Sequence, residues 1–189
     1  MSSFSWGDAR VTTDMTTLSG AVGAFFRAPV VPGTWDFNPG FSWTHCDIYF
    51  TTTTTLRFTY TVGAGAPVEP SISGALAPAK FSFSKAAGSE ALSLDWVAGD
   101  FRLVGVHLYN TNDPCIQIHN VGVAGSTAAT NISTAAGTGG AHWPAMFTPH
   151  LAVIDFGLND YVTNVVPETF AANVQTNIDH WRAAGADVI

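Results

Sequence analysis

The feature that most constrains the fold is a series of short residue runs with strand character in the first 110 residues of the chain. These runs are rich in β-branched and aromatic residues, and they alternate apolar with polar positions as half-buried strands do. They are Cys46–Phe50, Thr55–Val62, Lys80–Ser84, Ala91–Val97 and Asp100–Asn110. Turn-forming segments such as GAGAP, SGALAP, KAAGSE and VAGD separate them. Short strands joined by such turns predict an antiparallel, jelly-roll-like β-sandwich over residues 1–110.

Alternation also predicts which side chains share a face of the sheet, because successive side chains of a strand point to opposite sides. One predicted face of the second run consists of Leu56, Phe58, Tyr60 and Val62. In the last run, one face is predicted to carry Phe101, Leu103, Gly105, His107 and Tyr109, and the other Val104, Val106 and Leu108.

The composition excludes several classes of protein. The chain is 47% hydrophobic and 11% charged, whereas a disordered chain has low hydrophobicity and high charge. The net charge is −7 and the seven basic residues form no cluster, so we expect no nucleic-acid partner. No apolar run approaches the roughly 18 residues of a membrane span, and no basic start followed by an apolar core marks a signal peptide, so we expect no membrane partner.

The cysteines and histidines indicate no metal site. Cys46 and Cys115 form no C-x-x-C motif, which leaves either a disulfide or two buried free thiols, the latter being favoured. The six histidines are scattered and do not pair at the spacings of metal ligands within one element. We therefore expect them to be structural or surface residues, and we expect no cofactor.

The pattern changes after residue 110. His150–Gly157 is a continuous apolar run, which predicts a strand covered on both faces. A helix is predicted from Pro167, because Phe170, Val174, Ile178 and Trp181 recur on one helical face. Gly185 then suits the end of this helix, and Ala186–Ile189 has the character of another strand.

A strand, a helix and a second strand form a βαβ unit, which predicts a parallel sheet in residues 111–189. Two or three parallel strands leave open edges. We therefore expect the chain to be a fragment, or a partner chain or oligomer to complete the sheet. The predicted fold class is α+β: the sandwich followed by an incomplete flavodoxin-like parallel α/β unit.

Two loops follow the predicted strands of this second part. One is NVGVAGST, Asn120–Thr127, and the other is GLNDY, Gly157–Tyr161. Ligands bind outside the carboxyl ends of strands in open parallel sheets. The backbone N–H of Gly125 and the side-chain amide of Asn159 are both hydrogen-bond donors, and two converging donors stabilise a developing oxyanion. Glycine at position 125 also lets the backbone approach a substrate closely.

These two loops carry a family resemblance. The stretch VIDFGLNDY resembles the third motif block of the SGNH or GDSL hydrolases, in which a strand ends in Gly-x-Asn-Asp. The stretch IHNVGVAGST resembles their second block, an Asn followed some five residues later by a Gly. The resemblance covers roughly residues 116–189 and implies a serine esterase with a flavodoxin-like fold and no cofactor. It assigns Gly125 and Asn159 to the oxyanion hole.

The resemblance is partial. The first block should read Gly-Asp-Ser, whereas Gly7-Asp8-Ala9 has Ala at the nucleophile position. No Asp has a His three positions later, so the last block is missing as well. Ser126 follows Gly125 but is expected to cap the following helix with its hydroxyl. The nucleophile and the base therefore have no assigned position, and the chain alone is expected to be inactive.

The leading hypothesis is a segment of an SGNH-type esterase that acts on acyl, including acetyl, esters of a carbohydrate. The alternative is a non-catalytic carbohydrate-binding or phage virion or tail surface module. Its feature is the set of aromatic rings that includes Trp35 and Trp43, which either stacks on sugar rings or forms the core of the sandwich, the latter being favoured. The preferred location is extracellular or virion-associated.

Overall fold

The computed structural model describes residues 10–11, 26–27, 34–52, 55–72, 77–99, 102–113, 126–132, 141 and 143–189. These residues fall into two compact units, one containing the described residues up to 113 and the other those from 126 onward. Residues 111–113, which the sequence places in the second domain, belong to the first unit.

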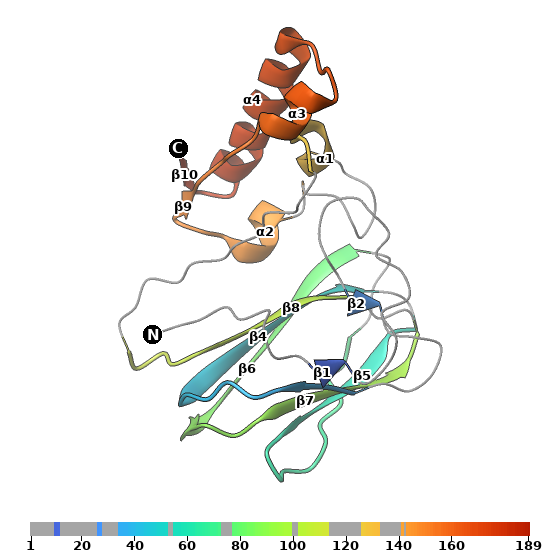
Figure 1. Ribbon diagram of the computed structural model, residues 1–189. Coiled ribbons are helices and arrows are strands. Elements are labelled where there is room, and N and C mark those ends of the chain that lie inside the picture. The colour runs from blue at the N-terminus through green and yellow to red at the C-terminus, as the bar shows by residue number, and fades with distance from the viewer. Residues whose placement is uncertain are drawn as a thin grey trace. The chain divides into compact units, whose positions relative to one another are not determined.

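The first unit consists of two antiparallel sheets (Figure 1). The first sheet has the order β1-β3-β7-β5, with β1 at Arg10–Val11, β3 at Thr34–Phe37, β7 at Leu92–Ala98 and β5 at Arg57–Val62. The second sheet has the order β2-β8-β4-β6, with β2 at Phe26–Arg27, β8 at Arg102–Tyr109, β4 at Trp43–Thr52 and β6 at Ala77–Gly88. The predicted β-sandwich architecture is confirmed, and with the helices of the second unit the fold class is α+β.

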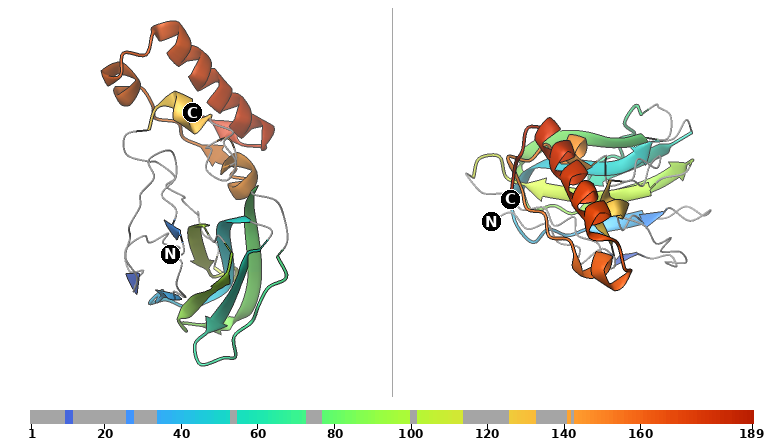
Figure 2. Two further views of the ribbon diagram at one scale, coloured as in Figure 1. Left: turned by 90° about the vertical axis from the view of Figure 1, so that its right-hand side faces the viewer. Right: turned by 90° about the horizontal axis from the view of Figure 1, so that it is seen from above.

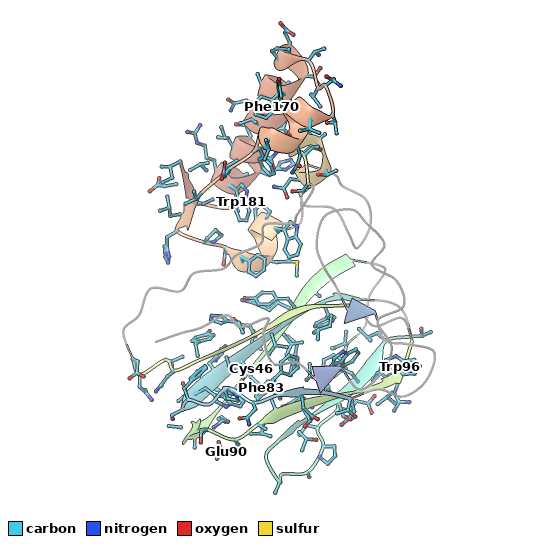
Figure 3. All side chains as sticks on the ribbon, viewed as in Figure 1. Cys46, Phe83, Glu90, Trp96, Phe170 and Trp181 are labelled. Carbon is cyan, nitrogen blue, oxygen red and sulfur yellow. The ribbon has the colours of Figure 1, made fainter. Side chains whose placement is uncertain are left out.

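The core of the sandwich is apolar and rich in aromatic rings. Phe50 and Phe58 meet edge to face with their ring centroids 5.7 Å apart, and Tyr60 stacks on Phe83 at 4.2 Å. Cys46 is a buried free thiol in the same core, and Figure 3 shows it beside Phe83. The predicted face of the run Thr55–Val62 is confirmed, because all four of its apolar residues pack in this core: Leu56, just before β5, and Phe58, Tyr60 and Val62 within it.

The predicted faces of β8 are wrong at one position. Leu103 is 1% exposed and belongs to the core with Val106 and Leu108, although alternation places it on the opposite face. The cause is a β-bulge: Tyr49 of β4 pairs with Gly105 and the next residue pairs with Leu103, so Val104 is an extra residue in β8. One unpaired residue inverts the faces on its far side.

The turn between β6 and β7 is held by Lys85. Its Nζ donates to the carbonyl of Ala86 at 2.8 Å, to that of Gly88 at 3.1 Å and to Glu90 Oε2 at 2.7 Å. The same ammonium lies 4.4 Å from the ring centroid of Trp43, a cation–π arrangement. These contacts satisfy the ammonium of Lys85, whose side chain is largely buried and points to the core side of β6.

The second unit contains four helices and a pair of short strands among its described residues. The helices are α1 at Ala128–Asn131, α2 at Trp143–Phe147, α3 at Leu158–Val162 and α4 at Pro167–Ala183. Strands β9 at Leu151–Ala152 and β10 at Asp187–Val188 pair in parallel, and α4 lies between them in sequence. The predicted βαβ unit with a parallel pair is therefore present, and Figure 2 shows α4 as its longest element.

The expectation of a long strand covered on both faces is wrong. β9 is two residues long, and Leu151 and Val153 are 52% and 72% exposed. Only alternate residues contact α4: Ala152 packs with Trp181 and Ala186 in a small apolar cluster. The side chains that point away from α4 therefore remain exposed.

The predicted helix after Pro167 is confirmed as α4. Proline occupies its first turn, where no intrahelical N–H bond is lost. Trp181 is 8% exposed, and Phe170 lies on the same helix in Figure 3. Gly185, with φ of 93°, follows the helix in the left-handed conformation. No helix in the described ranges is both long and apolar enough to cross a membrane.

Two glycines with positive φ allow the close packing of the sandwich to be tested. An alanine Cβ at Gly99 (φ +81°) would overlap the backbone carbonyl of Thr55, whereas at Gly40 (φ +65°) it would meet nothing within 4 Å. Both substitutions carry a left-handed strain of about 1–2 kcal/mol. We expect Gly99→Ala to cost about 1–3 kcal/mol more than Gly40→Ala, because only Gly99 meets backbone. Urea unfolding followed by tryptophan fluorescence measures both; equal losses would contradict the close approach at Gly99.

Candidate functional site

The candidate site is formed where the loop before α3 meets the loop before α1. Gly157 immediately precedes α3 and has φ of 131°, a conformation that other residues rarely adopt. This turn ends the extended segment after β9 and places Asn159 and Asp160 in the first turn of α3. The glycine of Gly-x-Asn-Asp therefore sets the direction in which the two polar side chains leave the chain.

Asn159 connects the two loops. Its Nδ2 donates to the backbone carbonyl of Ser126 at 2.9 Å, and the side chain is half-buried. The amide nitrogen carries two N–H groups. Within the described part of the chain, Nδ2 makes only this hydrogen bond, so its second N–H has no protein acceptor there. Gly125, the other predicted donor, lies outside the described residues, next to Ser126.

Asp160 holds the same two loops together from the interior. It is 2% exposed, and both of its carboxylate oxygens lie 3.2 Å from the backbone nitrogen of Ala128, which donates to them. Ala128 begins α1, so the carboxylate meets one of the N–H groups that the helix itself leaves unpaired. The Asp of the motif therefore has a structural part in the site.

The sequence predicts that Ser126 caps α1, but the residue that caps this helix is Thr127. Thr127 Oγ1 accepts from the backbone nitrogen of Thr130, and Thr130 Oγ1 accepts from the backbone nitrogen of Thr127. This reciprocal arrangement is a capping box with Thr in the place of the usual Glu. Ser126 takes part in the site through its backbone carbonyl.

Asn177 completes the support, although no sequence motif singled it out. This side chain of α4 is 2% exposed; it donates to the carbonyl of Ala128 at 3.1 Å and to that of Asn173 at 2.9 Å. Its Oδ1 accepts from Asn131 Nδ2 at 2.9 Å. The signal was present, since Asn177 lies four residues before Trp181 and thus on the apolar face of α4, where an amide needs partners.

The arrangement supplies a positioned donor next to a backbone loop. Asp160 and Asn177 bond the N–H and the C=O of Ala128, and Ala128 itself is 0% exposed. With the loop held on both sides, the amide of Asn159 has a fixed position, as electrostatic stabilisation of a developing negative charge requires. Among the described residues, no three His, Cys, Asp or Glu side chains are grouped to hold a metal ion.

The two tryptophans proposed for sugar stacking lie in the sandwich core. Trp35 is 3% exposed and Trp43 is 0% exposed. Trp43 Nε1 donates to the carbonyl of Glu90 at 2.9 Å, and one face of its ring is covered by Lys85. Neither indole presents an open face to a sugar ring, and their burial agrees with the alternative interpretation as core residues.

The role of Asp160 can be tested by its removal. Asp160→Ala leaves the buried N–H of Ala128 without its acceptor, so we expect the second unit to lose about 1.5–3 kcal/mol of stability. The matched control is Asp179→Ala on the exposed side of α4, where the carboxylate only accepts from Gln175 at 2.8 Å. That change should cost about 0.5 kcal/mol or less. Native-state hydrogen exchange across α4 measures both, and similar losses would contradict a supporting role for Asp160.

Comparison with known proteins assigns no family to the chain. No family model matches it, and no curated protein matches it. Among solved structures, it is similar to a family GH115 4-O-methyl-α-glucuronidase described as specific for decorated arabinogalactans, with 17% identity and a TM-score of 0.32. The match covers 43% of this chain and 13% of the glucuronidase chain. This similarity is too low to assign a fold or an activity.

Proposed function

We propose that the second unit carries the oxyanion-hole part of an SGNH-type serine ester hydrolase, with Asn159 as the side-chain donor. The observation that carries the proposal is the contact between the two loops that resemble the second and third motif blocks. In sequence, Asn159 is 33 residues from Ser126, and Asp160 is 32 residues from Ala128. Each of these two pairs is nevertheless joined by a hydrogen bond. A chance Asn-Asp turn has no reason to meet this particular loop.

The chemistry follows from the donor. In ester hydrolysis the carbonyl oxygen becomes an oxyanion, and a hydrogen bond that is stronger to the oxyanion than to the carbonyl lowers the barrier. The second N–H of Asn159 is available for this bond, and the backbone N–H of Gly125 is the second donor that the resemblance assigns. The substrate class in this proposal is an acyl ester, including an acetyl ester of a carbohydrate.

The carboxylate product provides a direct test, because its oxygen occupies the place of the oxyanion. We expect the side-chain amide signals of Asn159 in a ¹H–¹⁵N NMR spectrum to shift and saturate on titration with sodium acetate, with a dissociation constant of about 1 mM or weaker. The signals of Asn177 are an internal control, because its Nδ2 already donates to two carbonyls. Sodium chloride at equal ionic strength controls for screening.

Asn159→Asp replaces the donor by a carboxylate of similar shape and should abolish acetate binding. Ser126→Ala changes a side chain of which the site uses only the backbone, so it should bind acetate as the unchanged protein does. If acetate leaves the Asn159 signals unshifted, or if Asn159→Asp binds acetate equally well, the proposal fails. The loop would then be a structural contact, as expected of a non-catalytic module.

A further inference from the structure

A polar cluster lies on the outer face of the second sheet, outside the site described above. The bulky apolar residues of β4 point into the core. The alternate residues point outward, and each lies opposite a residue of β6 and a residue of β8. His45 pairs with Ser84 and Tyr109, and Asp47 pairs with Ser82 and His107. Directly opposed side chains of antiparallel strands are close enough to interact.

Asp47 is the centre of this cluster. It is 6% exposed, and its Oδ1 accepts from Ser82 Oγ at 2.5 Å. Its Oδ2 lies 3.4 Å from the hydroxyl of Tyr49, which donates to it. Burial, followed by the charge of Asp47, raises the pKa of Tyr109 to about 12. Burial, followed by the charge of Asp47, raises the pKa of Tyr49 as well, so both phenols remain protonated.

His45 lies between this carboxylate and a serine. Its Nε2 is 3.4 Å from Asp47 Oδ1, and its Nδ1 is 2.9 Å from Ser84 Oγ. The ring of Tyr109 packs against the imidazole with the centroids 4.9 Å apart. A carboxylate beside Nε2 favours the tautomer with its proton on Nε2. In that tautomer Nδ1 is an acceptor, so the hydroxyl of Ser84 donates to it.

We propose that Ser84, His45 and Asp47 form a nucleophile–base–carboxylate relay that makes Ser84 reactive toward acyl esters. A relay of this kind is recognised by its geometry and by the role of each group, whatever their order in the sequence. Ser84 is the nucleophile, His45 is the general base, and Asp47 is a positioning residue that sets the tautomer. The relay lies wholly in the first unit and does not depend on the function proposed for Asn159.

The reaction balances without a cofactor. Ser84 Oγ forms a bond to the acyl carbon, and its proton passes to His45 Nδ1. The bond between the acyl carbon and the alcohol oxygen breaks, and the leaving oxygen takes the proton from Nδ1. The products are an acyl-serine and an alcohol, and water releases the acid from the acyl-serine by the same proton transfers.

The surroundings allow a substrate to reach the serine. Ser84 is exposed, and the side chain of His45 is 23% exposed whereas that of Asp47 is 8% exposed. β6 is the last strand in the order of the second sheet, so Ser84 lies at an edge. Exposure thus decreases from Ser84 through His45 to Asp47. A substrate can reach the serine, while the carboxylate stays buried. The exposed position of Ser84 at the end of the strand order makes it accessible to small acyl esters from solution, such as acetyl esters.

A fluorophosphonate probe tests the relay, because the serine oxygen displaces fluoride from phosphorus with the same proton transfer to the base. We expect mass spectrometry of digested protein to find the probe on Ser84. Ser93 is the internal control: its Oγ donates to Asp36 at 2.5 Å, and no imidazole in the described part of the chain is paired with it. His45→Gln keeps a hydrogen-bonding side chain without a base and should slow labelling about 100-fold.

The pH profile separates a positioning role of Asp47 from a purely structural one. Labelling should rise as the imidazole loses its proton, and Asp47→Asn should slow labelling and change the pH midpoint. The titratable groups that face His45 across the cluster are Asp47, Tyr49, Lys80, His107 and Tyr109. His107→Gln is the control for the second imidazole and should leave the midpoint at its original pH.

Three results would overturn the relay: labelling of Ser84 no faster than that of Ser93, equal labelling in His45→Gln, or a flat pH profile. Circular dichroism establishes that each variant is folded. Ser84→Ala should retain the acetate response of Asn159, and Asn159→Asp should retain labelling of Ser84. The two proposals therefore fail independently.

Discussion

The second unit depends on one buried carboxylate. Asp160 is almost fully excluded from water and would be costly in an apolar interior without donors. The backbone N–H of Ala128 supplies the donor, and Asn177 bonds the carbonyl of the same residue. Because a partly satisfied buried polar network is unfavourable, the two bonds to Ala128 support each other. The position of Asn159 is a consequence, because it is the neighbour of Asp160 in a short helix.

In the first unit, strand β4 contributes both to the apolar core and to the polar cluster on the outer face. Its alternate residues Cys46, Ile48 and Phe50 are buried in the core, and the residues between them build the polar cluster around Asp47. The period of two makes the two faces inseparable, because a shift of register by one residue would exchange them. The apolar core therefore fixes where His45 and Asp47 stand relative to Ser84. Burial energy, which is not directional, thereby positions groups whose chemistry depends on direction.

The sequence predicted the elements well and their exceptions poorly. Alternation located strands β4 to β8 and the core face of β5 but not the short strands β1, β2 and β3. A period of 3.6 with Pro167 and Gly185 at the ends located α4. The bulge at Val104 was missed because an extra residue changes the pairing without changing the composition. The cap at Thr127 was missed because Ser and Thr are equivalent candidates until the helix start is known. Asn177 was not predicted because a core-facing helical face is recognised by its apolar residues, although a polar residue on that face is the more informative signal.

The two proposals concern complementary parts of acyl-transfer chemistry. An amide donor such as Asn159 stabilises charge that develops on a carbonyl oxygen, but it does not initiate attack. A serine bonded to an imidazole initiates attack, but it gains rate only if the new charge is stabilised. Sequence motifs identify the first kind of site, because a glycine turn and an amide are neighbours in the chain. Cross-strand geometry identifies the second, because His45 and Ser84 are 39 residues apart and meet only through the register of β4 and β6.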